Sequence, residues 1–208
     1  MIRTSEAGGL WTVTLDRPDK ANALTAAMLE ELADVAARAK AAEARALVLT
    51  GSGEVFSAGA DLAEARAGLA TSPLWERLSR AIAALPCLTV ATLNGTLAGG
   101  AFGMALACDL RLAVPRARFF YPVMKLGFLP QPSDPARLAA LVGPARAKMI
   151  LMAGLRADAE EALAWGLVDR IVAPARLLAE AAELGADACS ARPAHVAAIK
   201  AFFPDPAA

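Results

Sequence analysis

The chain has 208 residues, in which 21 basic side chains balance 21 acidic ones. This length suits one domain with a substantial core, and the balanced charge argues against nucleic acid or an anionic membrane surface as a partner. Three scattered cysteines without a C-x-x-C spacing indicate neither a disulfide framework nor a zinc site. Because the N-terminus also lacks a signal-peptide pattern, we expect a cytoplasmic protein.

The first part of the chain alternates predicted strands and helices. Residues 10–18 alternate apolar and polar side chains up to a proline, which predicts a strand near a sheet edge. Thr25 can cap an amphipathic helix, and the apolar run 46–50 predicts a strand covered on both faces. A helix at 73–85, a strand at 88–95, a helix at 100–108 and a strand at 110–114 follow. This alternation is typical of crossover units in an α/β core.

Residues 81–108 carry no charge and could in length span a bilayer. Pro86, Asn94-Gly95 and Gly99-Gly100 interrupt this segment, so a strand that turns into a core helix is the better interpretation. We therefore predict no membrane span.

From Ser133 onward the pattern is mainly helical, and only residues 167–172 are typical of a strand. No charged, Ser-rich or Pro-rich linker separates the two parts. The sequence predicts a single domain, with a core over residues 1–173 and a helical part over residues 174–208.

Several chemistries are excluded. His195 is the only histidine, so a site that needs several histidines is unavailable within one chain. The segment 51–59 lacks the spacing of a phosphate loop, and Ser57 lacks the glycine two positions earlier that a nucleophile elbow requires.

Two junctions remain, where a strand ends in small residues and a helix begins. They lie at Ala60 to Leu62 and at Gly99-Gly100. Free N–H groups at two such junctions can stabilise negative charge on one oxygen, at about 3 to 4 kcal/mol for each donor. Tight helix packing explains the same small residues equally well. The carboxylate of Asp61 is also explained by a position at a helix start.

The sequence resembles the crotonase superfamily, that is, enoyl-CoA hydratases and isomerases. The stretches that carry the resemblance occur in the family's order, and they are VTLDRPDKANALT, LVLTGSGEVFSAGADLAEA, VATLNGTLAGGAFGMALACDLRLA, ARFFYPVMKLGFLP and ADAEEALAWGLVDRIV. The resemblance implies an α/β spiral of ββα units with a helical C-terminal region. It also implies assembly as a homotrimer or a dimer of trimers.

The resemblance further implies an acyl-CoA thioester substrate, with coenzyme A as part of the substrate and no other cofactor or metal. The thioester carbonyl would sit between the backbone N–H groups of Ala60 and Gly100, where an enolate forms. Coenzyme A would lie along Lys20, Ala21, Asn22, Ala23 and Leu24, and along Ala58, Ala60, Asp61 and Leu62. Asp61 is then expected to order its loop and not to react.

The chain departs from the family where hydratases carry two glutamates. The corresponding residues are Gly103 and Val123, and the aspartate nucleophile of the dehalogenase branch corresponds to Gln131. Moving protons between carbons needs a base within hydrogen-bond reach, and neither Gly103 nor Val123 can supply one.

Asp134 and Tyr121 are the candidate substitutes for the missing acid and base. On the residues alone, a helix N-cap at Ser133 or Asp134 is the preferred interpretation. Tyr121 fits a core aromatic equally well. Glu64 and Lys125 are expected on the surface.

We therefore expect an acyl-CoA enzyme of fatty acid metabolism, a lyase or isomerase, that stabilises an enolate. Isomerisation, decarboxylation or thioester hydrolysis would replace standard hydration. A catalytically inactive acyl-CoA-binding or assembly subunit is the main alternative, and a structural paralogue without a CoA site is a third. The C-terminal part is shorter than usual for the family, so a lid is expected to be missing or supplied by another subunit.

Overall fold

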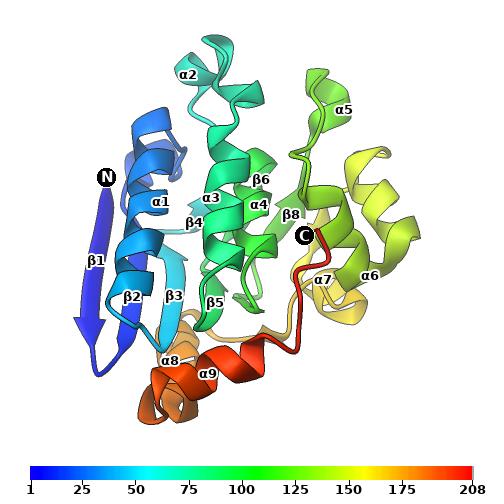
Figure 1. Cartoon of the computed structure of the whole chain (residues 1–208). Coiled ribbons are helices and arrows are strands. Elements are labelled where there is room, and N and C mark those ends of the chain that lie inside the picture. The colour runs from blue at the N-terminus through cyan, green and yellow to red at the C-terminus, as the bar shows by residue number, and fades with distance from the viewer. Residues whose placement is uncertain (208) are drawn as a thin grey trace.

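A computed structural model of the chain describes residues 1–207. The strands belong to two sheets (Figure 1). In chain order they are β1 (Ile2–Ala7), β2 (Leu10–Leu15), β3 (Ala46–Gly51), β4 (Val55–Ser57), β5 (Leu88–Leu93), β6 (Thr96–Ala98), β7 (Leu110–Ala113), β8 (Arg118–Phe120), β9 (Ala157–Asp158) and β10 (Arg170–Ile171).

Nine α-helices and four short 3-10 helices complete the described part of the chain. The α-helices are α1 (Ala26–Ala41), α2 (Leu62–Arg66), α3 (Leu74–Ala83), α4 (Phe102–Leu106), α5 (Val123–Leu126), α6 (Asp134–Leu151), α7 (Ala159–Trp165), α8 (Leu177–Ser190) and α9 (Pro193–Lys200). The 3-10 helices are η1 (Pro18–Lys20), η2 (Leu69–Thr71), η3 (Gly99–Ala101) and η4 (Pro174–Arg176).

The strand order is that of a spiral of ββα units. The larger sheet has the order β1-β2-β3-β5-β7-β10, and the smaller has the order β4-β6-β8-β9. Strands β3, β5 and β7 lie in the larger sheet, and the next strand after each of them lies in the smaller sheet. A helix follows each such pair, so the predicted α/β spiral of ββα units is confirmed.

The larger sheet is mainly parallel, with its one antiparallel pair at β1 and β2. Strand β3 is buried on both faces, as its continuous apolar run predicts. Strand β2 lies one place in from the edge, because β1 covers it. The sequence pattern missed β1, since five of its six residues are exposed and nothing alternates.

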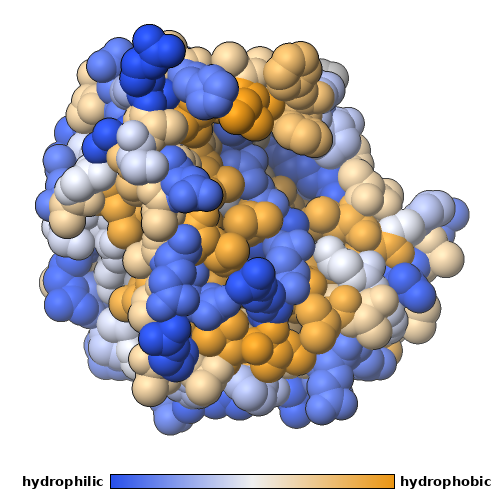
Figure 2. All heavy atoms as spheres, turned by 90° about the horizontal axis from the view of Figure 1, so that it is seen from below, coloured by the Kyte–Doolittle hydropathy of each residue, from blue (hydrophilic) through white to orange (hydrophobic). Residues whose placement is uncertain are grey.

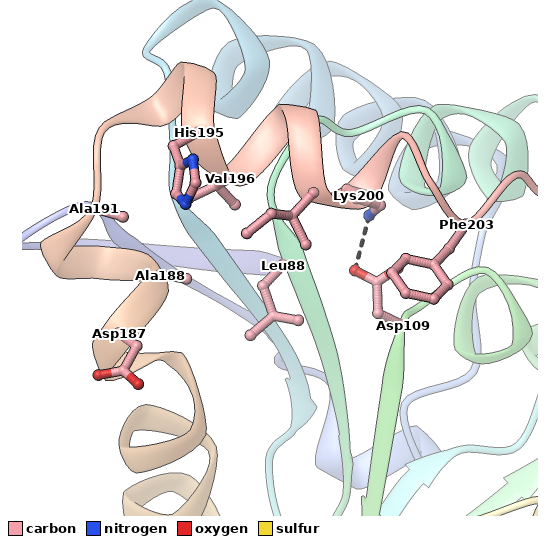
Figure 3. A pocket seen from close by; sticks show the side chains of 10 residues that line it. Leu88, Asp109, Asp187, Ala188, Ala191, His195, Val196, Lys200 and Phe203 are labelled. Atoms are coloured by element: carbon pink, nitrogen blue, oxygen red, sulfur yellow. Dashed lines mark hydrogen bonds and ion pairs between the residues drawn. The ribbon is translucent and has the colours of Figure 1, made fainter.

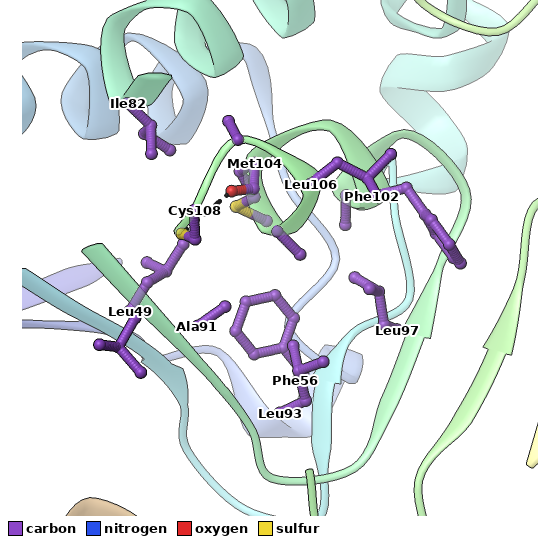
Figure 4. Packing of buried hydrophobic residues seen from close by; sticks show 14 of the residues in the cluster. Leu49, Phe56, Ile82, Ala91, Leu93, Leu97, Phe102, Met104, Leu106 and Cys108 are labelled. Atoms are coloured by element: carbon purple, nitrogen blue, oxygen red, sulfur yellow. Dashed lines mark hydrogen bonds between the residues drawn. The ribbon is translucent and has the colours of Figure 1, made fainter. Parts of the chain in front are cut away.

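Apolar side chains from both sheets and from α4 meet in the core. Phe56 of β4 is fully buried and faces Leu93 of β5, Leu97 of β6 and Met104 of α4 (Figure 4). This packing fixes where β4 and β6 end, and therefore where the loops after them lie. No helix within residues 1–207 is long and apolar enough to cross a membrane.

Local signals set several helix ends as predicted. The Thr25 side chain accepts a hydrogen bond from Met28 N at 3.2 Å and caps α1. Gly143 has φ 79° and interrupts α6, so Pro144 opens a second helical segment. The predicted helix at residues 100–108 is shorter, because η3 forms its first turn and α4 ends at Leu106.

Candidate active site

The two junctions between a strand and a helix lie against each other, and each begins with a glycine. Gly59 has φ +91° and follows β4, and Gly99 has φ +57° and follows β6. A Cβ atom at Gly59 would lie 3.0 Å from the Ala98 carbonyl oxygen and 3.5 Å from the Gly99 Cα. Glycine is therefore required at position 59 both by the backbone conformation and by the close approach of the second loop.

Ala60 and Gly100, one residue beyond these glycines, line one cavity of about 160 Å³. Apolar side chains from α2 and α5 form much of its wall, at the top of the molecule in Figure 1. The remaining lining residues include Ala58, Trp75, Tyr121 and Gln131.

The residues on either side of Ala60 form backbone hydrogen bonds with Leu24, but the N–H of Ala60 itself does not. Leu24 N donates to Gly59 O at 2.7 Å, and Asp61 N donates to Leu24 O at 2.8 Å. In extended backbone the intervening N–H points the other way. Gly100 lies in the first turn of η3, where N–H groups have no helical partner. Within residues 1–207, neither N–H donates a hydrogen bond.

The Trp75 ring packs directly against Gly100. A Cβ atom at this position would lie 3.0 to 3.1 Å from three atoms of the ring, so a side chain here would displace the tryptophan. The ring itself is fixed by its Nε1, which donates to Leu69 O at 2.8 Å. The sequence interpretation missed Trp75, because nothing local connects it to a glycine 25 positions later.

The two segments predicted to hold coenzyme A lie side by side. Ala58 N donates to Ala21 O at 3.0 Å, in addition to the bonds at Leu24. Lys20 is exposed, whereas Asn22 and Leu24 are fully buried. The side chains of Asn22 and Leu24 therefore support the loop and do not face the cavity.

Asp61 orders its loop. Its Oδ1 accepts from Ala63 N at 3.0 Å and caps α2, and its Oδ2 accepts from Arg17 Nη1 at 2.8 Å. The hydrogen bond from Arg17 is the largest of the effects that lower the pKa of Asp61. Arg17 also donates to Ala23 O at 3.1 Å, so it joins both predicted coenzyme A segments. The sequence interpretation did not include Arg17.

Asn22 holds this loop together from inside. Its Oδ1 accepts from Arg17 N at 2.8 Å, and its Nδ2 donates to Ser52 O at 2.9 Å and to Val55 O at 2.7 Å. We expect Asn22→Ala to lower the free energy of unfolding by about 2 to 4 kcal/mol, because it leaves buried backbone groups unpaired. Urea unfolding measures the effect, and Lys20→Ala in the same loop is the control, expected within about 0.5 kcal/mol of the parent. An equally small change for Asn22→Ala would contradict this prediction.

Tyr121 and Asp134 form a buried pair beside the cavity. The Tyr121 hydroxyl donates to Asp134 Oδ2 at 3.0 Å, and the Tyr121 ring stacks on Phe102 at 5.4 Å between centroids. Tyr121 lines the cavity, whereas Asp134 is 0% exposed and lies behind it. Asp134 Oδ1 has no hydrogen-bond partner within residues 1–207.

Burial raises the pKa of Asp134 to about 7, against the opposing effects of the Tyr121 hydrogen bond and the Arg137 charge. Burial, and then the neighbouring Asp134 carboxylate, raise the pKa of Tyr121 far above its ordinary value. The phenol therefore keeps its proton, and Asp134 is the group of the pair that titrates near neutral pH.

Gly103 makes room for Asp134. A Cβ atom at Gly103 would lie 2.9 Å from Asp134 Oδ1. The space beside Gly103 is therefore filled by a carboxylate from a different helix. The contact joins α4 to α6, which are distant in the sequence, so no local pattern indicates it.

The preferred interpretation of Ser133 or Asp134 as a helix-capping side chain is wrong. Ser133 occupies the N-cap position of α6, but no side chain caps that end. The Ser133 hydroxyl donates to Glu76 instead, and Ser133 N donates to Glu76 Oε2 at 3.2 Å. In an N-cap the serine oxygen would accept from a backbone N–H of the first turn, whereas here the hydroxyl is turned to donate to a charged carboxylate, which makes the stronger hydrogen bond.

The other candidates lie away from the cavity. Glu64 is half-buried and its Oε2 accepts from Ala26 N at 2.6 Å, which ties α2 to the start of α1. Lys125 is exposed, as predicted. Within residues 1–207 no group of three or more His, Cys, Asp or Glu side chains could hold a metal ion.

His195 lies at a second cavity, of about 630 Å³, between α8, α9 and the starts of β5 and β7 (Figure 3). Apolar surface surrounds this region on the underside of the molecule (Figure 2), and Phe203 is 76% exposed. Lys200 and Asp109 form an ion pair at 2.8 Å on its wall. This cavity lies at the opposite end of the molecule from α2 and α5, so His195 is remote from the glycine junctions.

A ββα spiral with two apposed glycine loops beside a cavity defines a crotonase-type fold. The chain belongs to the enoyl-CoA hydratase/isomerase family, whose sequence profile matches residues 5–207.

Its relatives agree with this assignment. It is 37% identical to a probable enoyl-CoA hydratase of Mycobacterium leprae over 88% of this chain and 76% of the relative. It is 36% identical to the carnitinyl-CoA dehydratase of Escherichia coli K12 over 97% of this chain and 79% of the relative. The crystal structure of an enoyl-CoA hydratase/isomerase from Pseudoalteromonas atlantica superposes with a TM-score of 0.90, at 31% identity, over 97% of this chain and 82% of that one.

Proposed function

We propose that this protein is an acyl-CoA enzyme that stabilises a thioester enolate through the N–H groups of Ala60 and Gly100. The observation that carries the proposal is that Ala60 and Gly100, the two residues whose N–H groups have no partner within residues 1–207, line one cavity, which Tyr121 also lines. Donors already in place lower the energy of a developing oxyanion without reorganisation. The names of the relatives, an enoyl-CoA hydratase and a carnitinyl-CoA dehydratase, support a coenzyme A thioester as the substrate.

Tyr121 and Asp134 are proposed to move the proton. The Tyr121 oxygen takes a proton from the substrate α-carbon while its own proton passes to Asp134 Oδ2, which lies 3.0 Å away. The electron pair of the broken C–H bond forms the enolate, held by the two amides. Asp134 is the net base, and a pKa near the working pH suits that task.

The single proton relay formed by Tyr121 and Asp134 supports fewer reactions than the two glutamates of a hydratase do. Returning the proton to a different carbon isomerises the acyl chain, and protonating an enolate left by loss of CO₂ completes a decarboxylation. Neither Gly103 nor Val123 can position and deprotonate a water for ordinary hydration. We therefore propose isomerase or decarboxylase activity in place of standard hydration, or thioester hydrolysis, in which the Tyr121–Asp134 pair would take a proton from water as it adds to the carbonyl and return it to the departing thiolate.

The remaining proposals follow from family membership and from the paired loops. Coenzyme A is proposed to lie along residues 20–24 and 58–62, which hydrogen-bond to each other. No cofactor beyond the substrate's own coenzyme A is invoked. We propose a cytoplasmic homotrimer or dimer of trimers that acts in fatty acid metabolism.

A second candidate function is an inactive acyl-CoA-binding or assembly subunit. The complete burial of Asp134 favours it, because this carboxylate reaches the cavity only through Tyr121. Such a protein would bind acyl-CoA without exchanging its α-protons.

Exchange of substrate α-protons in D₂O, followed by mass spectrometry of the acyl-CoA, tests the proposal. Every enolate-forming reaction gives this signal, whichever product follows. We expect deuterium at the α-carbon of a saturated acyl-CoA, together with hydration of crotonyl-CoA far below ordinary hydratase rates. Binding by calorimetry without exchange would favour the binding subunit, and hydration at ordinary rates would refute the importance of the missing glutamates.

A further inference from the structure

A buried carboxylate and a buried guanidinium lie one helical turn apart at the start of α6 without pairing. Asp134 is 0% exposed and the Arg137 side chain is 2% exposed. Side chains three residues apart on a helix are neighbours. Asp134 Oδ1 and Arg137 Nη1 nevertheless both lack a hydrogen-bond partner within the described chain, and the two residues form no ion pair there.

Asp205 engages Arg137 instead. Arg137 Nε donates to Asp205 Oδ1 at 3.0 Å and Nη2 donates to Oδ2 at 2.6 Å, which is a two-pronged contact. Asp205 lies in the segment after α9, which runs back towards the start of α6 (Figure 1). The segment therefore holds the Arg137 guanidinium by Nε and Nη2, and these two nitrogens would otherwise be free to bind another carboxylate.

We propose that Asp205 is a positioning residue, which keeps the Arg137 guanidinium from pairing with Asp134 and so leaves Asp134 free to exchange a proton with Tyr121. This rests on the proposed function, in which Asp134 is the net base. The effect is indirect, because Asp205 touches neither the cavity nor Tyr121.

Among the charged groups around Asp134, only Arg137 can exchange its present ion-pair partner for Asp134. Tyr121, before α5, donates to Asp134. Glu76 of α3 is already bonded to Ser133 and to Arg80, whose Nε donates to it at 2.6 Å. Partial burial acts to raise the pKa of Glu76, but the bonds from Arg80 and Ser133 outweigh it and lower that pKa. Glu76 therefore stays ionised, and Arg80 stays occupied.

The test is Asp205→Asn, which removes the charge that competes for Arg137. Infrared absorption of the protonated carboxyl, assigned by its loss in Asp134→Asn, follows the titration of Asp134 directly. We expect its midpoint to fall by about 1 to 3 pH units, the usual effect of a close cation on a carboxyl. The pH dependence of α-proton exchange should move in the same direction, with KM unchanged.

Two further variants complete the design. Asp205→Glu keeps the charge and should restore the parent midpoint. Arg137→Gln removes the cation, so as a single variant it should raise the midpoint of the Asp134 titration. In the double variant with Asp205→Asn it should cancel the fall. Should Asp205→Asn fail to fold, Asp205→Ser replaces it, since this variant also removes the competing charge and an unchanged midpoint there overturns the proposal.

An unchanged midpoint in folded Asp205→Asn, or a fall that Arg137→Gln does not reverse, also overturns it. The infrared titration needs no turnover. Loss of the proposed function therefore shows as absent exchange with the midpoint still shifted, and it is distinguishable from failure of this inference.

Discussion

Replacing Asp134 by Asn is expected to reduce α-proton exchange by about 100-fold or more while acyl-CoA still binds. The amide preserves the shape of the side chain and can accept the Tyr121 hydrogen bond, but it cannot take up a proton. General base catalysis contributes about 10² to 10⁴ in rate, which sets the expected size. Exchange rates and calorimetric affinity, measured on the same preparation, separate chemistry from binding.

The same substitution should stabilise the fold. The pKa of Asp134 is raised from its ordinary 3.8 to about 7 in the folded chain, so between these values the folded state binds the proton more tightly. Stability contributed by this group is therefore lost as pH rises through that window. Asp134→Asn should remove this dependence and gain on the order of 2 kcal/mol at pH 8.

Tyr121→Phe is the matched comparison, because it keeps the ring that stacks on Phe102 and removes only the relay oxygen. It should reduce exchange about as much as Asp134→Asn does. Full exchange activity in either variant would remove the relay from the mechanism, whatever the change in stability.

Replacing the Gly100 amide by an ester is expected to reduce exchange by about 100-fold to 1,000-fold, the usual cost of one oxyanion-hole donor. An encoded glycolic acid exchanges the N–H for an oxygen and adds no atoms. This matters because any Cβ at position 100 would meet the Trp75 ring. The rate of α-proton exchange is again the measurement.

The control is an ester at Ala63, whose N–H already donates to Asp61. It perturbs the neighbouring loop without touching the proposed oxyanion donors and should leave exchange within a few fold. Equal losses at Gly100 and Ala63 would mean that the loops were merely loosened, and the oxyanion role of Gly100 would fail.

The fold could be predicted largely because its signals are local. Thr25 caps α1 through a residue three positions later, and the buried strand β3 has a continuous apolar run. The exposed strand β1 was missed, since its only support is pairing with β2. Local sequence patterns therefore predict the helices and the inner strands, but they do not predict an edge strand that is stabilised only by pairing with its neighbour.

The site divides in the same way. The two junctions, at Ala60 to Leu62 and at Gly99-Gly100, are recognisable in the sequence, and the resemblance implies that they act together. The environment of Asp134 is not predictable, because its local sequence fits an N-cap while its contacts come from Tyr121 and from the space at Gly103. Asp205 and Arg137 are 68 residues apart, a separation that no periodicity reveals.

The thioester carbonyl itself reports most directly on the two amides. In infrared difference spectra with an acyl-CoA labelled with ¹³C at the carbonyl, we expect the bound carbonyl stretch at lower frequency than in free solution. An ester at Ala60 or at Gly100 should each return part of the shift, and both together should return all of it. A bound carbonyl with the frequency of free acyl-CoA would contradict the account.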